Sequence, residues 1–133
     1  MEELNIPKST VKEIEYIVKP NDTAVEFRSG EVNVLATPKL IALMEEASYL
    51  CVKEFLPMGY VSVGTMIKVE HLKASCVGEK IRIESKFIEN DGRKLLFNMQ
   101  AFSSNELIAK GECERFVVEK QRFEKKALEN ATK

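Results

Sequence analysis

The stretch that decides the fold runs from Thr37 to Leu56 and reads TPKLIALMEEASYLCVKEFL. Threonine is a good helix N-cap, and proline is favoured at the first helical position, where its missing N–H costs nothing. The pair Thr37-Pro38 therefore predicts a helix start, and Pro57 predicts its end. At about 100° per residue, the apolar side chains of this segment cover one wide arc. We expect a long central helix with little surface left for water.

The segments after this helix alternate between apolar and polar residues, as half-buried strands do. Strands are predicted at Tyr60–Lys73, Lys80–Glu89, Lys94–Ser103 and Leu107–Val118. Turn residues separate them, with a hairpin at Asn90-Asp91-Gly92. Two further strands, Val11–Lys19 and Ala24–Phe27, are expected before the helix. One helix against one face of a long antiparallel sheet is an α+β, two-layer fold.

Length and composition predict one domain over residues 1–133, with a peripheral arm (1–10) and a peripheral tail (120–133). The chain has 20 basic and 21 acidic residues, a balance that argues against nucleic-acid and anionic-membrane partners. It holds no apolar run long enough for a bilayer and no apolar leader near the N-terminus. A cytoplasmic protein is expected.

Cysteine and histidine usage argues against a metal site. The three cysteines, Cys51, Cys76 and Cys113, form no CxxC pair, and their odd number does not fit a disulfide framework. His71 is the only histidine. Reduced thiols and the absence of a metal centre are the resulting prediction.

Three side chains carry reactive groups where the pattern calls for an apolar or a surface residue. Glu45 lies at the margin of the apolar arc, either as a carboxylate reaching water or as a partly buried base or nucleophile. His71 shares a predicted strand face with Val63 and Ile67, which leaves a core role and a catalytic role open. Capping alone explains Thr37, although a helix start also offers free N–H groups to a developing oxyanion.

Two further positions are weaker candidates. Gly64 interrupts a predicted strand, which often marks a bulge or a close approach of backbone to ligand. Arg115 has the parity of inward residues such as Cys113 and Val117. A bulge near Gly111 would reverse that parity and make Arg115 a surface cation, and both readings stay open.

Four sites at fixed spacing resemble the hotdog-fold acyl-CoA thioesterases, in particular the branch typified by the fluoroacetyl-CoA-specific enzyme. These sites are Thr37, Glu45 in Leu43-Met44-Glu45, the pair Gly64-Thr65, and His71, and the resemblance covers about residues 10–125. It implies hydrolysis of a small acyl-CoA with Thr37, Glu45 and His71 as catalytic residues and no cofactor besides the coenzyme A of the substrate. It also implies that Gly64, Thr65 and Arg115 bind substrate or coenzyme A.

One segment departs from that branch. Where its fluoroacetyl member has a phenylalanine-rich lid, this chain has Arg28-Ser29-Gly30-Glu31-Val32-Asn33. The resemblance therefore does not extend to fluoroacetyl selectivity.

Helix geometry constrains how such a site is assembled. Eight residues separate Thr37 from Glu45 by about 12 Å along a regular helix. Either the chain bends before Leu40, or the site combines residues of two subunits. We expect a homodimer paired edge to edge, with sites at the subunit interface. The alternative hypothesis is a non-catalytic module that binds acyl-CoA or an acyl carrier.

Overall fold

The computed structural model describes residues 3–131 of the chain. Its elements, in chain order, are β1 (Val11–Ile17), a 3-10 turn (Pro20–Asp22), α1 (Thr37–Lys53), β2 (Tyr60–His71), β3 (Lys80–Asp91), β4 (Lys94–Ser103), β5 (Glu106–Glu119) and α2 (Lys120–Ala131). The long central helix and the four long strands after it are confirmed.

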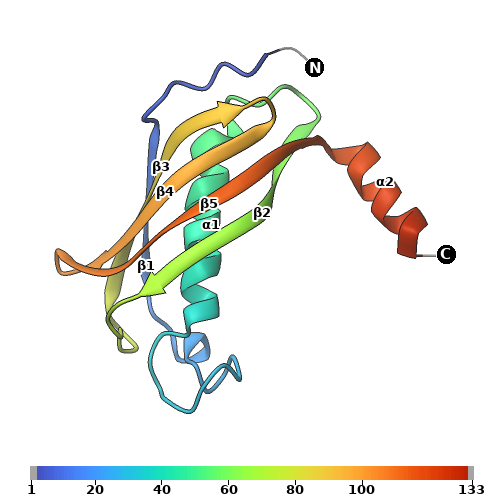
Figure 1. Cartoon of the computed structure of the whole chain (residues 1–133). Helices are drawn as coiled ribbons and strands as arrows, with labels where there is room; N and C mark the ends of the chain where they lie inside the picture. The colour runs from blue at the N-terminus through green and yellow to red at the C-terminus, as the bar shows by residue number, and fades with distance from the viewer. Residues whose placement is uncertain (1–2, 132–133) are drawn as a thin grey trace.

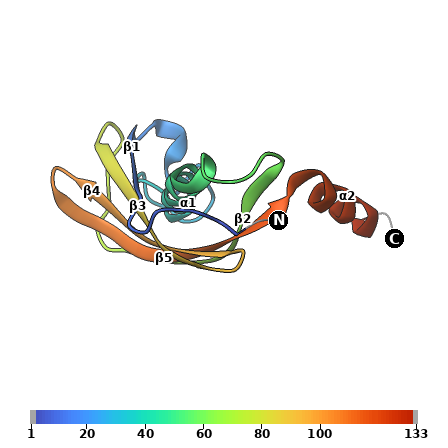
Figure 2. The ribbon, with the colours of Figure 1, turned by 90° about the horizontal axis from the view of Figure 1, so that it is seen from above.

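The five strands form one antiparallel sheet in the order β1-β3-β4-β5-β2. The sheet crosses α1 and curves around it, as the view from above shows (Figures 1 and 2). The expected α+β fold, a long sheet wrapped around one helix, is therefore the observed one. The two sheet edges are β1 and β2, and β2 is the longer, with 12 residues against 7.

The core lies between α1 and the sheet. One side of α1 is buried through Leu40, Leu43, Met44, Ala47, Ser48, Cys51 and Val52. Phe87 of β3 and Phe97 of β4 meet edge to face below it, with ring centroids 5.8 Å apart. The buried hydroxyls of Ser48 and Ser85 satisfy each other at 2.7 Å, which removes the cost of two unpaired polar groups. These contacts fix the helix against the sheet.

Three expectations about local structure are wrong. Ala24–Phe27 is a turn and not a strand, because it closes on itself through the Phe27 N–H to Thr23 O bond of 2.9 Å. The regular part of α1 ends at Lys53, three residues before Leu56. The N-terminal arm is not peripheral, since Leu4 and Ile6 are buried in the core.

The predicted face of the second long strand is half wrong, because β2 contains a bulge. Register with β5 shifts between Gly64 and Met66, so Thr65 is an extra residue. A bulge reverses the alternation of side chains on its two sides. Ile67 and His71 face α1 as expected, but before the bulge the inward side chain is that of Ser62, and Val61 is exposed.

The C-terminal segment is a regular helix, α2, with no buried residue. It extends past the β2 edge and away from the sheet (Figures 1 and 2). None of the helices in residues 3–131 combines the length and the apolar character that a bilayer crossing requires.

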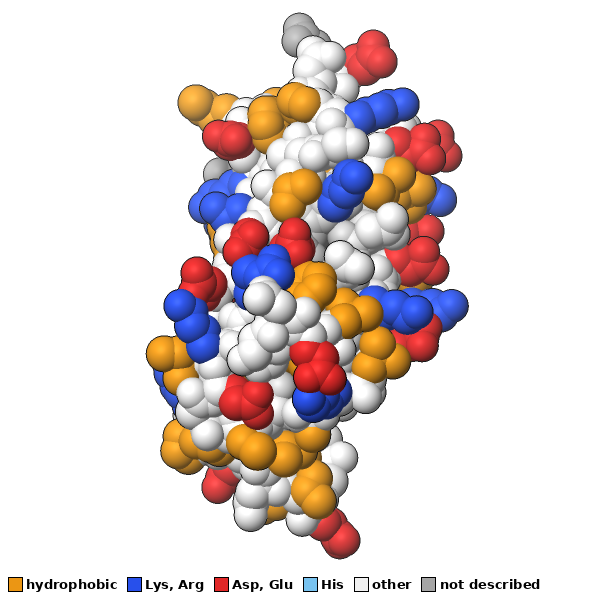
Figure 3. All heavy atoms as spheres, turned by 90° about the vertical axis from the view of Figure 1, so that its left-hand side faces the viewer, with side chains coloured by type: hydrophobic (Ala, Val, Ile, Leu, Met, Phe, Trp, Pro, Cys, Tyr) orange, Lys and Arg blue, Asp and Glu red, His pale blue; other side chains and the backbone are white. Residues whose placement is uncertain are grey.

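The β1 edge is protected by charge. Glu13 and Glu15 of β1 form ion pairs with Arg82 and Lys80 of β3. The face on that side shows acidic and basic groups next to each other, with hydrophobic groups between them (Figure 3). Charged side chains of this kind discourage pairing with another strand. The longer β2 edge is therefore the better candidate for a second chain.

A pair of glycine substitutions tests how closely β2 and β5 approach. A Cβ on Gly111 would overlap the backbone of Lys68 and touch Val69, whereas a Cβ on Gly64 would meet the carboxylate end of Glu45 at 2.6 Å. Backbone cannot move aside as a side-chain end can. We expect Gly111→Ala to lower the free energy of unfolding by about 2–3 kcal/mol in urea titrations.

Gly64→Ala is the matched control, with the same chemical change in the neighbouring strand. We expect it to change the stability by less than about 1 kcal/mol, because the Glu45 side chain rotates away. Equal losses for the two variants would contradict this account of the strand contact.

Candidate active site

The first candidate pair joins the start of α1 to the end of β2. The Thr37 hydroxyl lies 2.8 Å from Nδ1 of His71. Thr37 is the first helical residue, and the N-cap is Ala36, which makes no side-chain cap bond. The expected capping role of Thr37 is therefore wrong. Ala36 is fixed by backbone bonds to Asp22 and Leu40, which leaves the threonine hydroxyl for the imidazole.

The surroundings of His71 favour the neutral imidazole. Burial lowers the pKa of His71 below its ordinary value of 6.5, and a backbone contact to Lys73 partly offsets this effect. Its Nε2 atom is buried and has no hydrogen-bond partner among the described residues. An unsatisfied buried nitrogen is costly, and such atoms are often reserved for a substrate or a proton.

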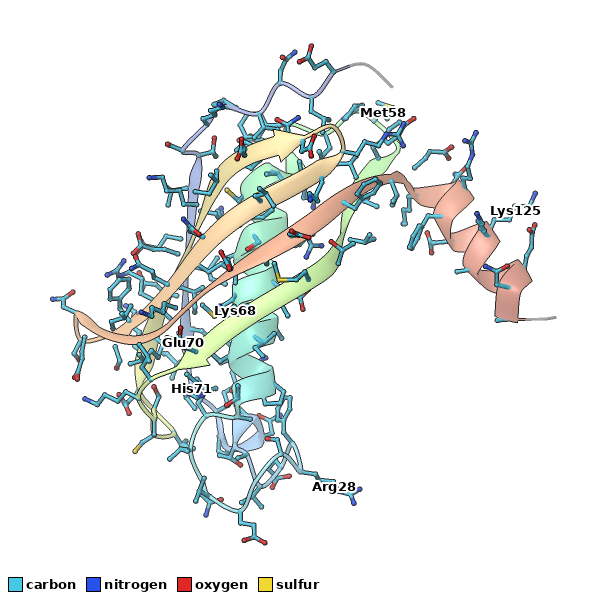
Figure 4. All side chains as sticks on the ribbon, in the orientation of Figure 1. Arg28, Met58, Lys68, Glu70, His71 and Lys125 are labelled. Atoms are coloured by element: carbon cyan, nitrogen blue, oxygen red, sulfur yellow. The ribbon has the colours of Figure 1, made fainter. Side chains whose placement is uncertain are left out.

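A pocket of about 310 Å³ lies beside this pair. The loop before α1 and the loop after β2 form most of it, and its lining includes Thr37, His71, Gly30, Val32 and Leu72. Apart from His71 and Lys73, the side chains that line it are small or aliphatic, and none is a phenylalanine. Figure 4 shows His71 at the end of β2 and Arg28 at the tip of the loop before α1. The volume of the pocket lies at the lower end of the range typical of small-molecule sites.

A second cluster surrounds Glu45 in the middle of α1. Arg115 is only 7% exposed. Of the two predictions for this residue, the one that points its side chain inward is confirmed. Its guanidinium donates to the Ser62 hydroxyl at 2.8 Å, to the Ser62 carbonyl at 2.9 Å and to Glu45 Oε2 at 3.5 Å. Burial lowers the pKa of Arg115, while Cys113, Glu45 and Tyr49 act in the opposite direction. The side chain is therefore a buried cation that orients Glu45.

Gly64 and Thr65 form the strand side of this second cluster. The bulge expected from Gly64 is present, and the missing side chain of Gly64 leaves room for the Glu45 carboxylate. Thr65, the extra residue, donates from its hydroxyl to the Glu114 carbonyl at 3.2 Å. Sequence reasoning missed Ser62. A polar residue between Val61 and Val63 was the available signal.

The two clusters lie apart within one chain. Helix α1 is regular from Thr37 to Lys53, so Thr37 and Glu45 are separated by about 12 Å along its axis. The chain does not bend before Leu40. Of the two ways in which Thr37 and Glu45 were expected to share one site, a bend in the chain is therefore excluded. The Glu45 side chain is 42% exposed, on a side of α1 that Ala42 and Tyr49 also leave open to solvent.

The described residues contain no group of three or more histidine, cysteine or acidic side chains with metal-binding geometry. Cys51, Cys76 and Cys113 are all free thiols. Burial raises the pKa of the Cys51 and Cys113 thiols, which makes them weaker nucleophiles.

This architecture, a long antiparallel sheet wrapped around one helix with polar groups on the inner face of β2, is that of a hotdog-fold protein. Solved structures agree. A mutant fluoroacetyl-CoA thioesterase in complex with acetyl-CoA has a TM-score of 0.87 at 23% identity, covering 93% of this chain and 98% of that one. A Thermus thermophilus thioesterase superfamily member has a TM-score of 0.86 at 24% identity, covering 96% and 93%.

Sequence comparison goes further than the fold. The sequence model of the fluoroacetyl-CoA-specific thioesterases matches residues 18–121. The fluoroacetyl-CoA thioesterase of Streptantibioticus cattleyicolor is 30% identical over 93 residues, which are 70% of this chain and 67% of that protein. The chain belongs to the fluoroacetyl-CoA-specific thioesterase family, and it is a hydrolase.

The protonation of His71 is directly measurable, because it is the only histidine in the chain. We expect its imidazole resonance in NMR to titrate with a midpoint below 6.5. Because the folded-state pKa lies below the unfolded value, this residue favours folding above pH 6.5, and the contribution is lost as the pH falls toward the folded-state pKa.

His71→Gln removes the resonance and serves as the assignment control. A midpoint at or above 6.5 would show that burial does not govern this group.

Proposed function

We propose that this protein hydrolyses a small acyl-CoA thioester to the free acid and coenzyme A, with a site made of Thr37, Glu45 and His71. The observation that carries the proposal is the Thr37–His71 hydrogen bond at the wall of an open pocket, in a chain of a thioesterase family. That a structural neighbour was solved with acetyl-CoA supports an acyl-CoA substrate.

The residues have the chemistry that thioester hydrolysis requires. Glu45 either attacks the carbonyl carbon or takes a proton from the attacking water. In both routes the C–S bond breaks, and the coenzyme A sulfur leaves as a thiolate that takes up a proton. When water attacks, its oxygen is bonded to the carbonyl carbon of the free acid. When Glu45 attacks, a mixed anhydride with Glu45 forms first, and a water molecule then cleaves it to the free acid and the Glu45 carboxylate. His71 is the proton carrier, because Thr37 holds its Nδ1 and leaves Nε2 without a partner. Backbone N–H groups at the start of α1 or at Gly64 stabilise the oxyanion.

A second subunit brings the His71 imidazole and the Glu45 carboxylate close to each other. We propose a homodimer in which β2 pairs antiparallel with β2 of a second copy. Residue numbers that face each other across such a pair have a constant sum. With the two-fold axis at Lys68 the sum is about 136, so His71 faces residue 65 of the second copy. That bulge lies against Glu45 of the same copy, so each site takes its imidazole and its carboxylate from different chains.

The remaining expectations stay part of the proposal. The enzyme uses no cofactor other than the coenzyme A of its substrate. Three free thiols support a reducing, cytoplasmic setting.

Release of free thiol from acetyl-CoA and from longer straight-chain acyl-CoAs tests the proposed residues. We expect Glu45→Gln to lower kcat about a hundredfold or more, because it removes the base or nucleophile, and His71→Ala to lower it about tenfold or more. Glu46→Gln is the matched control. It changes the same group at the exposed neighbouring position and keeps wild-type turnover.

Unchanged turnover for Glu45→Gln would remove this carboxylate from the mechanism, and unchanged turnover for His71→Ala would return the histidine to a packing role. If the wild type binds acyl-CoA and releases no thiol from any chain length, the protein is the non-catalytic binding module.

Hybrid dimers test whether the site is shared. A dimer of one Glu45→Gln chain and one His71→Ala chain holds one site with both native groups only when the two groups come from different chains. We expect co-expressed, doubly tagged hybrids to recover about half of the wild-type turnover per dimer. Hybrids no more active than the two parent variants would place the whole site in one chain, and sedimentation of an active monomer would exclude the dimer.

A further inference from the structure

Helix α2 has almost no contact with its own chain. None of its residues is buried, although it is regular over residues 120–131. It is anchored at its start, where the Lys120 N–H donates to the Gly59 carbonyl at 3.0 Å next to the first residue of β2. From there it projects past the β2 edge and away from the sheet (Figures 1 and 2). A second copy at this edge therefore meets α2.

Exposed apolar side chains gather at the two ends of β2. The first cluster, at the start of β2 and the start of α2, contains Met58, Val61 and Phe123, and Met58 is fully exposed. The second cluster, at the pocket beyond His71, contains Val32 and Leu72, which line the pocket and are exposed. Figure 4 shows Met58 and His71 at opposite ends of the strand. Each cluster is an apolar surface without a cover.

The proposed two-fold axis at Lys68 places the start of β2 of one chain beside the segment that follows β2 of the other. With a register sum of about 136, residue 60 of one chain faces residue 76 of the other, just beyond the loop that lines the pocket. The first cluster of each chain then meets the second cluster of its neighbour. Burial of both by one symmetric contact explains why a monomer leaves them exposed.

Charge on α2 matches the substrate. Arg122, Lys125 and Lys126 lie on one side of the helix, next to the apolar side chains of Phe123 and Leu128. Lys125 and Lys126 form no ion pair with another residue in the range 3–131, and Arg122 pairs with Glu119 at 3.6 Å while 85% exposed. Coenzyme A carries phosphate groups, for which free cations beside a pocket are suitable partners.

We propose that α2 of each subunit packs beside the pocket of the other subunit and binds the phosphates of coenzyme A through Arg122, Lys125 and Lys126. This inference rests on the proposed function and on the β2 pairing. It assigns to α2 a binding role in a site whose reacting groups lie elsewhere.

Neutralising the three cations tests the phosphate contact. We expect the triple variant Arg122→Gln, Lys125→Gln, Lys126→Gln to raise KM for acyl-CoA about tenfold or more. KM for the N-acetylcysteamine thioester of the same acyl group stays unchanged, because this substrate has no phosphates. The control is Lys8→Gln, Lys12→Gln, Lys86→Gln, which removes the same charge from exposed positions on the β1 side and leaves both KM values as in the wild type.

An unchanged KM for acyl-CoA, or equal increases for the two substrates, overturns the phosphate role. If the wild type hydrolyses no thioester, the proposed function fails, and calorimetric binding of coenzyme A provides the same comparison. Weaker binding by the α2 variant alone then supports the inference, and equal binding overturns it.

A hybrid dimer tests whether α2 acts on the neighbouring subunit. One chain carries His71→Ala and the other carries the α2 triple variant. If α2 serves the other chain, the one site with a native His71 also receives a native α2, and its KM for acyl-CoA is that of the wild type. A KM equal to that of the homodimeric α2 variant would show that α2 serves its own chain.

Discussion

The site depends on one extra residue in β2. Gly64 and His71 are seven positions apart, so on a regular strand they would face opposite sides of the sheet. The bulge at Thr65 reverses the alternation and turns both toward α1. The imidazole then reaches the Thr37 hydroxyl, and the Glu45 carboxylate packs against the backbone at Gly64. A strand without the bulge would carry the same residues and assemble only one of these two contacts.

Most of the fold follows from local patterns, and the part that does not is at the site. The apolar arc of α1 and the alternation of β3 and β4 follow directly from burying one face, so their positions were predictable. The alternation Val61, Val63, Thr65, Ile67 is equally regular in sequence, and it concealed the bulge because apolar residues fall on both faces before it. The role of Thr37 was misread for a similar reason. Capping accounts for a threonine before proline, and only the tertiary contact with His71 shows that the hydroxyl is in use elsewhere.

The burial of Arg115 shows how the sheet supports Glu45. A guanidinium at 7% exposure loses hydration, which is compensated only when its donors find acceptors. Ser62 supplies two acceptors from the neighbouring strand, and Glu45 supplies the opposite charge. The carboxylate itself remains 42% exposed on the open side of α1. Such an arrangement holds the carboxylate in place and leaves it accessible to solvent.

The proposed dimer connects several features that a single chain leaves open. Within a single chain, the imidazole and the carboxylate are too far apart, the β2 edge is unpaired, and apolar clusters at both ends of that edge lack a cover. These three features are independent of one another, and each could be satisfied by a different contact. Antiparallel pairing of β2 with its own copy addresses all of them together, because a two-fold axis exchanges the ends of the strand. In the proposed dimer, the sharing of the site and the packing of α2 are consequences of one symmetry operation.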